Sequence, residues 1–265
     1  MWAQGCASGP CLEVGFDRHQ DEVAMMEQTT GTRTAGAQQA LRVAPSILSA
    51  DFARLADEMA EVAGVVELLH VDVMDGHYVP NITIGPPVVK SIRKATDRFL
   101  DCHLMISDPA TYAPQFVEAG ADSVTFHPEV EDDPAALIDR LHEQGAQVGV
   151  AVRPHQPLSL VTEVLDRIDL LLIMTVQPGF GGQAFMSDVV PKIAEAHRWR
   201  VEHGATFRLE VDGGISRDTI AETVRAGADT FVAGNAIYAE ADRVAAVHAL
   251  ATTAQQALAP VVQER

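Results

Sequence analysis

From Val43 onward, short apolar runs alternate with longer amphipathic stretches. The apolar runs are roughly four to eight residues long, which is typical of strands, and the stretches between them have the spacing of helices. Five amphipathic stretches end in a glycine just before the next apolar run, at Gly64, Gly120, Gly145, Gly204 and Gly227. Because glycine commonly ends a helix in the left-handed conformation, the pattern predicts a repeating unit of helix, glycine stop and strand.

Eight strands are predicted: Val43–Leu48, Glu67–Met74, Phe99–Met105, Ser123–His127, Val148–Val152, Leu170–Thr175, Arg208–Asp212 and Thr230–Ala233. The helical patterns between them include Phe52–Val62, Pro109–Ala119, Pro134–Glu143, Val189–Val201 and Thr219–Ala226. Two of these helices follow an aspartate and begin with a proline, at Asp108-Pro109 and Asp133-Pro134. Proline is accepted in the first turn of a helix, so these pairs support the predicted starts.

Strands that alternate with helices pair in parallel, and eight near-equal units predict a single-domain α/β fold, the (β/α)8 or TIM barrel. A doubly wound open sheet is the alternative, but it gives no reason for eight equal units. The barrel is expected to span residues 42–265. Residues 1–41 show no sustained periodicity and are predicted to be a disordered or loosely attached extension.

Composition and charge exclude several classes of function. The chain has 265 residues, 47% of them hydrophobic, and a formal net charge of −18, which argues against binding nucleic acid or an anionic membrane surface. No apolar run approaches the roughly 18 residues of a membrane span, and the first residues lack the pattern of a signal peptide. The three cysteines, Cys6, Cys11 and Cys102, form no disulfide framework. Reduced thiols and a cytoplasmic location are therefore expected.

The second predicted strand carries chemistry on one of its faces. By alternation, His70, Asp72 and Met74 share one face, and Val71 and Val73 share the other. A buried, ionised carboxylate without a partner is costly, so Asp72 needs a compensating group.

Polar residues also end other strands, where active sites of such barrels lie. They are Asp101 and His103 on the third strand, His127 on the fourth, and Glu210 and Asp212 on the seventh. A single histidine or aspartate at a strand end is more often structural. Two histidines and two aspartates that converge at one mouth are harder to explain by packing, and they suit a divalent metal.

Three consecutive loops near the end of the chain are rich in glycine. They contain Gly179-Phe180-Gly181-Gly182, Gly213-Gly214 and Gly234-Asn235. Exposed backbone amides in such loops can hold an anion, and the last loops of a barrel often bind phosphate. None of the predicted strands contains a lysine, which disfavours Schiff-base chemistry.

Six strings closely resemble the ribulose-phosphate 3-epimerase family: APSILSADF (44–52), HVDVMDGHYVPNITIGP (70–86), DCHLMI (101–106), MTVQPGFGGQAF (174–185), EVDGGI (210–215) and AGNAIY (233–238). The resemblance covers the chain from about Val43 to the C-terminal helix. It implies a metal-dependent (β/α)8 enzyme of carbohydrate metabolism, of the pentose phosphate pathway type. Such an enzyme inverts C3 of D-ribulose 5-phosphate to give D-xylulose 5-phosphate through an enediolate.

The resemblance also implies roles for individual residues. The metal ligands would be His70, Asp72, His103 and Asp212, holding one divalent cation (Zn, Fe, Mn or Co). Asp72 and Asp212 would be the acid–base pair. Substrate contacts would come from Ser46, His103, Asp212 and the phosphate loops at Gly179, Phe180, Gly181, Gly182, Gly213, Gly214, Gly234 and Asn235. The family usually has serine where this chain has Asn235.

Met74, Met105 and Met174 would cap the enediolate, although plain core packing explains them equally well. Two other functions stay open: a 3-epimerase for a related ketose phosphate such as allulose 6-phosphate, and a catalytically inactive phosphosugar-binding module. The expected partner is a small ketose phosphate, with neither nucleic acid nor membrane, and the protein is expected to form a homo-oligomer.

Overall fold

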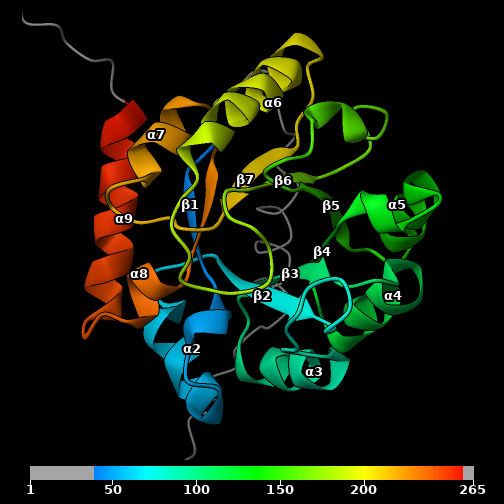
Figure 1. Ribbon diagram of the computed structural model, residues 1–265. Helices are drawn as coiled ribbons and strands as arrows, with labels where there is room; N and C mark the ends of the chain where they lie inside the picture. The colour runs from blue at the N-terminus through cyan, green and yellow to red at the C-terminus, as the bar shows by residue number, and fades with distance from the viewer. Residues whose placement is uncertain (1–38, 259–265) are drawn as a thin grey trace, which may run out of the picture. The chain divides into compact units, whose positions relative to one another are not determined.

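The computed structural model describes residues 39–258, and within them eight parallel strands form one sheet. The order along the sheet is β1-β8-β7-β6-β5-β4-β3-β2, so neighbours in sequence are neighbours in space (Figure 1). The strands are β1 (Arg42–Pro45), β2 (Leu68–Met74), β3 (Phe99–Met105), β4 (Ser123–Phe126), β5 (Gln147–Val152), β6 (Leu170–Met174), β7 (Arg208–Asp212) and β8 (Thr230–Ala233).

A parallel bridge between Ser46 and His70 joins the two end strands of the sheet, β1 and β2. Ser46 directly follows β1, and His70 lies within β2 and is one of the predicted site residues. The predicted (β/α)8 barrel is therefore confirmed, with its closure at residues that carry chemistry.

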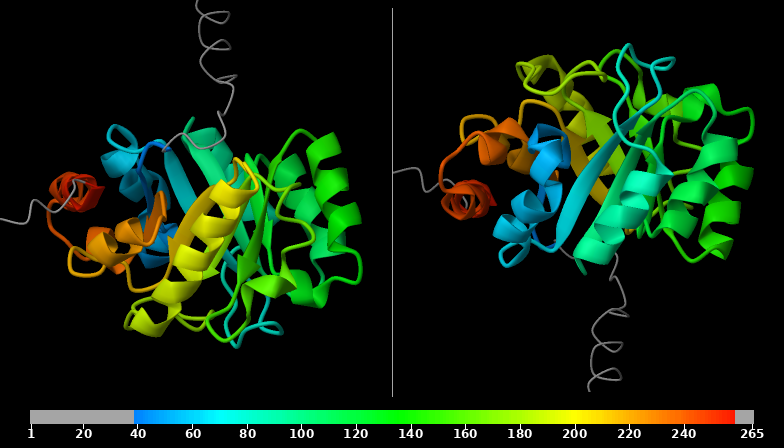
Figure 2. Two further views of the ribbon diagram at one scale, coloured as in Figure 1. Left: turned by 90° about the horizontal axis from the view of Figure 1, so that it is seen from above. Right: turned by 90° about the horizontal axis from the view of Figure 1, so that it is seen from below.

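Helices surround the strands on the outside of the barrel (Figure 2). The α-helices are α2 (Leu55–Ala63), α3 (Pro86–Ala95), α4 (Pro109–Ala119), α5 (Pro134–Glu143), α6 (Val190–Glu202), α7 (Ile220–Arg225), α8 (Asn235–Tyr238) and α9 (Arg243–Leu258). Short 3-10 helices are η1 (Ile47–Ser49), η2 (Phe52–Arg54), η3 (Pro128–Val130), η4 (Leu158–Leu160) and η5 (Ser187–Val189). No helix within residues 39–258 combines the length and apolar character needed to cross a membrane.

Local capping explains why α4 and α5 begin where the sequence predicts and why α4 ends there. The Asp108 side chain accepts a hydrogen bond from the Thr111 amide at 3.0 Å, which satisfies a free donor of the first turn of α4. Asp133 caps α5 in the same way at the amide of Ala136. Gly120 ends α4 with a φ of +109°, the conformation expected of a glycine stop.

Three local predictions are wrong. β1 ends at Pro45 rather than Leu48, because Ser46 caps η1 by accepting a hydrogen bond from the Leu48 amide. The helix predicted from Phe52 is divided into η2 and α2. Gly64 has a φ of −72° and is right-handed, unlike the other four glycine stops.

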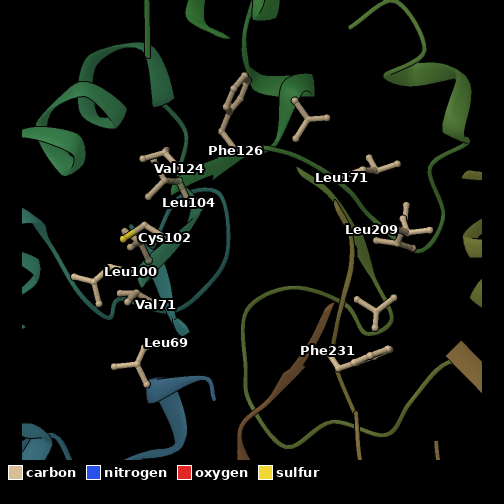
Figure 3. Packing of buried hydrophobic residues seen from close by; sticks show 14 of the residues in the cluster. Leu69, Val71, Leu100, Cys102, Leu104, Val124, Phe126, Leu171, Leu209 and Phe231 are labelled. Carbon is tan, nitrogen blue, oxygen red and sulfur yellow. The ribbon is translucent and has the colours of Figure 1, made fainter. Parts of the chain in front are cut away.

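The strands present two chemically different faces, as alternation predicts. Val71, Cys102 and Leu104 belong to a large apolar cluster packed between strands and helices (Figure 3). Met74 and Met105 belong to a small separate cluster with Val79. Packing between barrel and helices therefore uses one set of side chains and leaves the other set for the barrel interior.

The predicted extension, residues 1–41, lies outside the described residues up to position 38. Residues 39 and 40 contact the barrel. The Gln39 side chain donates hydrogen bonds to the Thr206 and Phe207 carbonyls, and Arg208 donates one to the Ala40 carbonyl at 2.7 Å. The barrel therefore includes residues before Arg42.

Candidate active site

Four candidate metal ligands converge at the C-terminal mouth of the barrel. His70 and Asp72 come from β2, His103 from β3 and Asp212 from β7. In the β2–β3 register Asp72 lies opposite His103, so the two side chains meet inside the barrel. One ligand atom from each of the four residues lies within 4.8 Å of the other three.

The distances inside this cluster are short. Asp72 Oδ1 lies 3.4 Å from His70 Nε2 and 3.2 Å from His103 Nδ1. His103 Nδ1 is also 3.8 Å from Asp212 Oδ2. The other oxygen of Asp72, Oδ2, accepts a hydrogen bond from the Ser46 hydroxyl at 2.6 Å. Ser46, predicted as a substrate contact, therefore also orients Asp72.

The residues present fit a divalent metal. His70 Nε2 is a buried nitrogen with no hydrogen-bond partner among the described residues. Buried polar atoms rarely stay unpartnered, and this one faces a carboxylate oxygen of the same cluster. Two imidazoles and two carboxylates are ligands that suit Zn, Fe, Mn or Co.

Burial and neighbouring charge drive the two aspartates in opposite directions. Burial opposes ionisation of Asp72, but His70 and His103 outweigh it and hold the pKa of Asp72 well below its usual value. Burial and the Asp72 carboxylate raise the pKa of Asp212 to about 6. Burial also lowers the pKa of His70, yet Asp72 and Asp101 overcome it and raise that pKa well above 6.5.

A second layer of buried polar residues supports the cluster. Asp101 Oδ2 accepts a hydrogen bond from His70 Nδ1 at 2.8 Å, and Glu210 Oε1 lies 3.4 Å from the same nitrogen. Burial and the nearby Asp101 raise the pKa of Glu210 well above its usual value. His127 contacts His103 through their Nε2 atoms at 3.0 Å. Burial and the nearby His103 and Arg153 lower the pKa of His127 well below 6.5.

A cavity of about 340 Å³ opens above the two aspartates. This volume suits a small metabolite. Apart from the two buried histidines, every site residue that the sequence predicted lines the cavity: Ser46, Asp72, Met74, Met105, Met174, Gly179, Phe180, Gly181, Gly182, Asp212, Gly213, Gly214, Gly234 and Asn235. His70 and His103 are fully buried and reach the aspartates instead.

Glycine is required at two adjacent positions of the cavity wall. Gly213 and Gly214 have φ values of +120° and +67°. A Cβ at Gly214 would lie 2.5 Å from the Phe185 amide nitrogen, and one at Gly213 would lie 2.4 Å from Val176 Cγ2. These turns therefore bring backbone amides to the cavity where no side chain fits.

Sequence reasoning missed some residues of the site. Ser49 and Ser216 add hydroxyl groups to the cavity wall. Ser49 lies within SILSADF, directly after a misassigned strand end, so the alternation could not place it. Asp75 is an anchor rather than a reactive group, because its carboxylate accepts hydrogen bonds from the His77, Tyr78 and Ser107 amides and from the Ser107 hydroxyl.

The fold and the site together define a class. The chain is a (β/α)8-barrel enzyme. Its candidate metal site, formed by His70, Asp72, His103 and Asp212, lies beside a cavity walled by glycines. Solved structures of low identity agree with the fold: 3-keto-L-gulonate-6-phosphate decarboxylase from Vibrio cholerae superposes with a TM-score of 0.64 at 15% identity, over 83% of this chain and 100% of that one.

Sequence comparison defines the family. The family model of the ribulose-phosphate 3 epimerases matches residues 42–238, and the chain belongs to that family. It is 51% identical to ribulose-phosphate 3-epimerase of Mycobacterium leprae, over 78% of this chain and 92% of that protein. It is 47% identical to ribulose-phosphate 3-epimerase of Bacillus subtilis, over 78% of this chain and 96% of that protein.

Proposed function

We propose that this protein is an isomerase that interconverts D-ribulose 5-phosphate and D-xylulose 5-phosphate, in carbohydrate metabolism of the pentose phosphate pathway type. The observation that carries the proposal is a pair of carboxylates, the buried Asp72 and the partly buried Asp212, at the inner end of a glycine-walled cavity. Relatives whose sequences are 51% and 47% identical to this chain are named ribulose-phosphate 3-epimerase, which supports the same reaction here.

The phosphate would be held at the glycine-rich wall. Backbone amides at Gly179–Gly182, Gly213-Gly214 and Gly234-Asn235 supply donors without a competing side chain. Asn235 adds a carboxamide next to Gly182. A Cβ built on Gly182 would lie only 2.6 Å from Asn235 Nδ2. A phosphate held at this wall places the carbon chain toward the aspartates, which orients C3 for reaction.

Asp72 and Asp212 would move the proton at C3. Inversion requires removal of the proton α to the C2 ketone from one face and return of a proton to the opposite face. The two carboxylates come from β2 and β7, and their pKa values are shifted in opposite directions, that of Asp72 downward and that of Asp212 upward. One can therefore act as base while the other acts as acid, and the reverse reaction exchanges these roles.

A divalent cation held by His70, Asp72, His103 and Asp212 would supply positive charge that stabilises the oxygens of the enediolate. Zn, Fe, Mn and Co all suit this set of ligands. His103, also predicted as a substrate contact, is fully buried and does not line the cavity, so it would act as a metal ligand. Met74, Met105 and Met174 line the cavity and would enclose the flat intermediate with apolar contacts that exclude water.

We expect a cytoplasmic homo-oligomer. Cys102 is a free, buried thiol, in keeping with a reducing compartment. Ile82 is 77% exposed, which leaves a large apolar side chain free for contact with a second copy. Light scattering on the purified protein should give a mass of two or more chains, and a monomer would contradict the expectation.

A substrate comparison tests the proposal. Purified full-length protein, reconstituted separately with Zn²⁺, Mn²⁺, Fe²⁺ and Co²⁺, is assayed with D-ribulose 5-phosphate and D-allulose 6-phosphate. We expect the highest kcat/KM with the pentulose, loss of activity after chelation, and recovery when metal is restored. A preference for the hexulose would reassign the substrate, full activity in metal-free protein would refute the metal, and inactivity on both would leave an inactive binding module.

A further inference from the structure

Each histidine of the candidate metal site, His70 and His103, has one ring nitrogen turned toward the cluster of ligands and the other turned toward a buried partner. For His70 the cluster nitrogen is Nε2 and the partner is Asp101. For His103 the cluster nitrogen is Nδ1 and the partner is His127. The two rings thus point different nitrogens at the same place, and each must leave that nitrogen free of a proton to bind a metal.

Asp101 determines which nitrogen of His70 carries the proton. The distance from His70 Nδ1 to Asp101 Oδ2 is 2.8 Å, and both side chains are completely buried. A carboxylate oxygen at this distance accepts from Nδ1, so when His70 binds a metal through Nε2 its remaining ring proton lies on Nδ1. His70 Nε2 is then a bare lone pair that faces the cluster.

The contact between His103 and His127 admits a single proton between the two Nε2 atoms, which lie 3.0 Å apart. If His103 donates, its Nδ1 is bare and faces the two aspartates. If His127 donates, His103 must be protonated on Nδ1, the nitrogen that would bind metal. The surroundings of His127 decide between these two arrangements.

The carboxylate of Glu129 lies on the far side of His127. Glu129 Oε1 is 3.8 Å from His127 Nδ1, and it is held there by the Tyr78 hydroxyl at 2.7 Å and by Arg153 Nε at 3.1 Å. The Tyr78 ring also packs on the His127 ring, with centroids 4.8 Å apart. Glu129 Oε1 is a carboxylate oxygen that faces His127 Nδ1, so a proton on that nitrogen points toward an acceptor, and His127 Nε2 is left as the acceptor for His103.

We propose that Asp101 and His127 are positioning residues that fix opposite tautomers of the two metal-binding histidines. Asp101 holds His70 with Nε2 bare, and His127 holds His103 with Nδ1 bare. This inference rests on the metal site proposed above, and it adds Tyr78, Glu129 and Arg153 as the group that orients His127. The two bare nitrogens meet an incoming cation without rotation of either ring, which favours binding.

Paired variants separate hydrogen-bond acceptance from packing. His127→Gln retains a carbonyl oxygen that can accept from His103 Nε2, whereas His127→Leu fills similar space without an acceptor. Asp101→Asn and Asp101→Leu form the equivalent pair for His70. His142, which pairs with Asp169 at 2.9 Å outside the cluster, supplies the control variants His142→Gln and His142→Leu.

The readout is the affinity for Zn²⁺, measured by competition with a chromophoric chelator, with circular dichroism to establish folding. We expect the two leucine variants at the site to bind Zn²⁺ about 10- to 100-fold more weakly, the range found for partners of metal-binding histidines. The Gln and Asn variants should recover most of that loss, and both His142 variants should bind as the wild type does. Wild-type affinity in His127→Leu or Asp101→Leu would overturn the role of that residue.

Nitrogen-15 NMR of the Zn²⁺-loaded wild type tests the tautomers without any variant. Ring protons are expected on Nδ1 of His70 and on Nε2 of His103, and protons on the opposite nitrogens would overturn the inference. This experiment still decides the matter if a leucine variant fails to fold. Failure of the wild type to bind Zn²⁺, Mn²⁺, Fe²⁺ or Co²⁺ would instead refute the proposed metal site itself.

Discussion

Gly214→Ala should both destabilise the barrel and weaken substrate binding. The φ of Gly214 is +67°, and an added Cβ would lie 2.5 Å from the Phe185 amide nitrogen and 2.7 Å from the Phe185 Cα. These are backbone atoms, so no flexible side-chain end can move away. The left-handed conformation costs about 1–2 kcal/mol for a residue with a Cβ. Overpacking adds about 1–3 kcal/mol, so the expected loss is about 2–5 kcal/mol.

Two other glycines separate these contributions. Gly145 has a φ of +87° but no atom within 4 Å of an added Cβ, so Gly145→Ala carries only the backbone cost, about 1–2 kcal/mol. Gly64 has a φ of −72° and the same free space, so Gly64→Ala should be neutral or stabilising by about 0.4–1 kcal/mol.

Urea unfolding of the three variants and the wild type measures the free energies, with an unchanged slope required for comparison. The expected order of stability is Gly64→Ala, then Gly145→Ala, then Gly214→Ala. Phe185 follows the 179–182 loop, so its displacement should also raise KM for the phosphorylated substrate in Gly214→Ala alone. Equal stability of Gly145→Ala and Gly214→Ala, with unchanged KM, would refute the steric argument.

Two further predictions concern carboxylates with different tasks. Hydrogen bonds from Ser107 and from nearby loop amides lower the pKa of Asp75 to about 2, below the value of about 3.9 in an unfolded chain. The stabilisation that ionised Asp75 gives is therefore complete above about pH 4 and is lost as the pH falls through about 2. The difference in unfolding free energy between the wild type and Asp75→Asn should shrink over that pH range. A constant difference would contradict this prediction. Asp72→Asn and Asp212→Asn should each lower kcat by at least about 10²- to 10⁴-fold while the circular dichroism spectrum stays unchanged, and wild-type turnover in either variant would remove that residue from the mechanism.

Much of the fold could be predicted because local signals and the global pattern agree. β3, α4 and α5 have the predicted bounds, since Asp108 and Asp133 cap their helices and Gly120 ends one of them. The end of β1 could not be predicted in the same way. Residues 46–48 read as a continuation of an apolar run, but the Ser46 hydroxyl caps a 3-10 turn and reaches Asp72, which lies 26 positions away in the sequence.

Within the site, alternation correctly predicts which side chains face the barrel interior on β2 and β3. It does not predict how the interior residues pair. The contacts of Asp101 with His70, and of His127 with His103, depend on strand register and ring orientation. In the sequence, each of these residues appears only as a polar residue near the end of a strand. The sequence gives no information on which nitrogen of a histidine carries the proton.

The central claim is that this chain inverts C3 by proton transfer with solvent exchange. Incubation of the metal-reconstituted protein with D-ribulose 5-phosphate in deuterated water, followed by proton NMR, measures both product and label. The expected result is D-xylulose 5-phosphate that carries deuterium at C3, with neither product nor label in Asp72→Asn. Absence of both xylulose 5-phosphate and C3 deuterium in the wild type would contradict the claim.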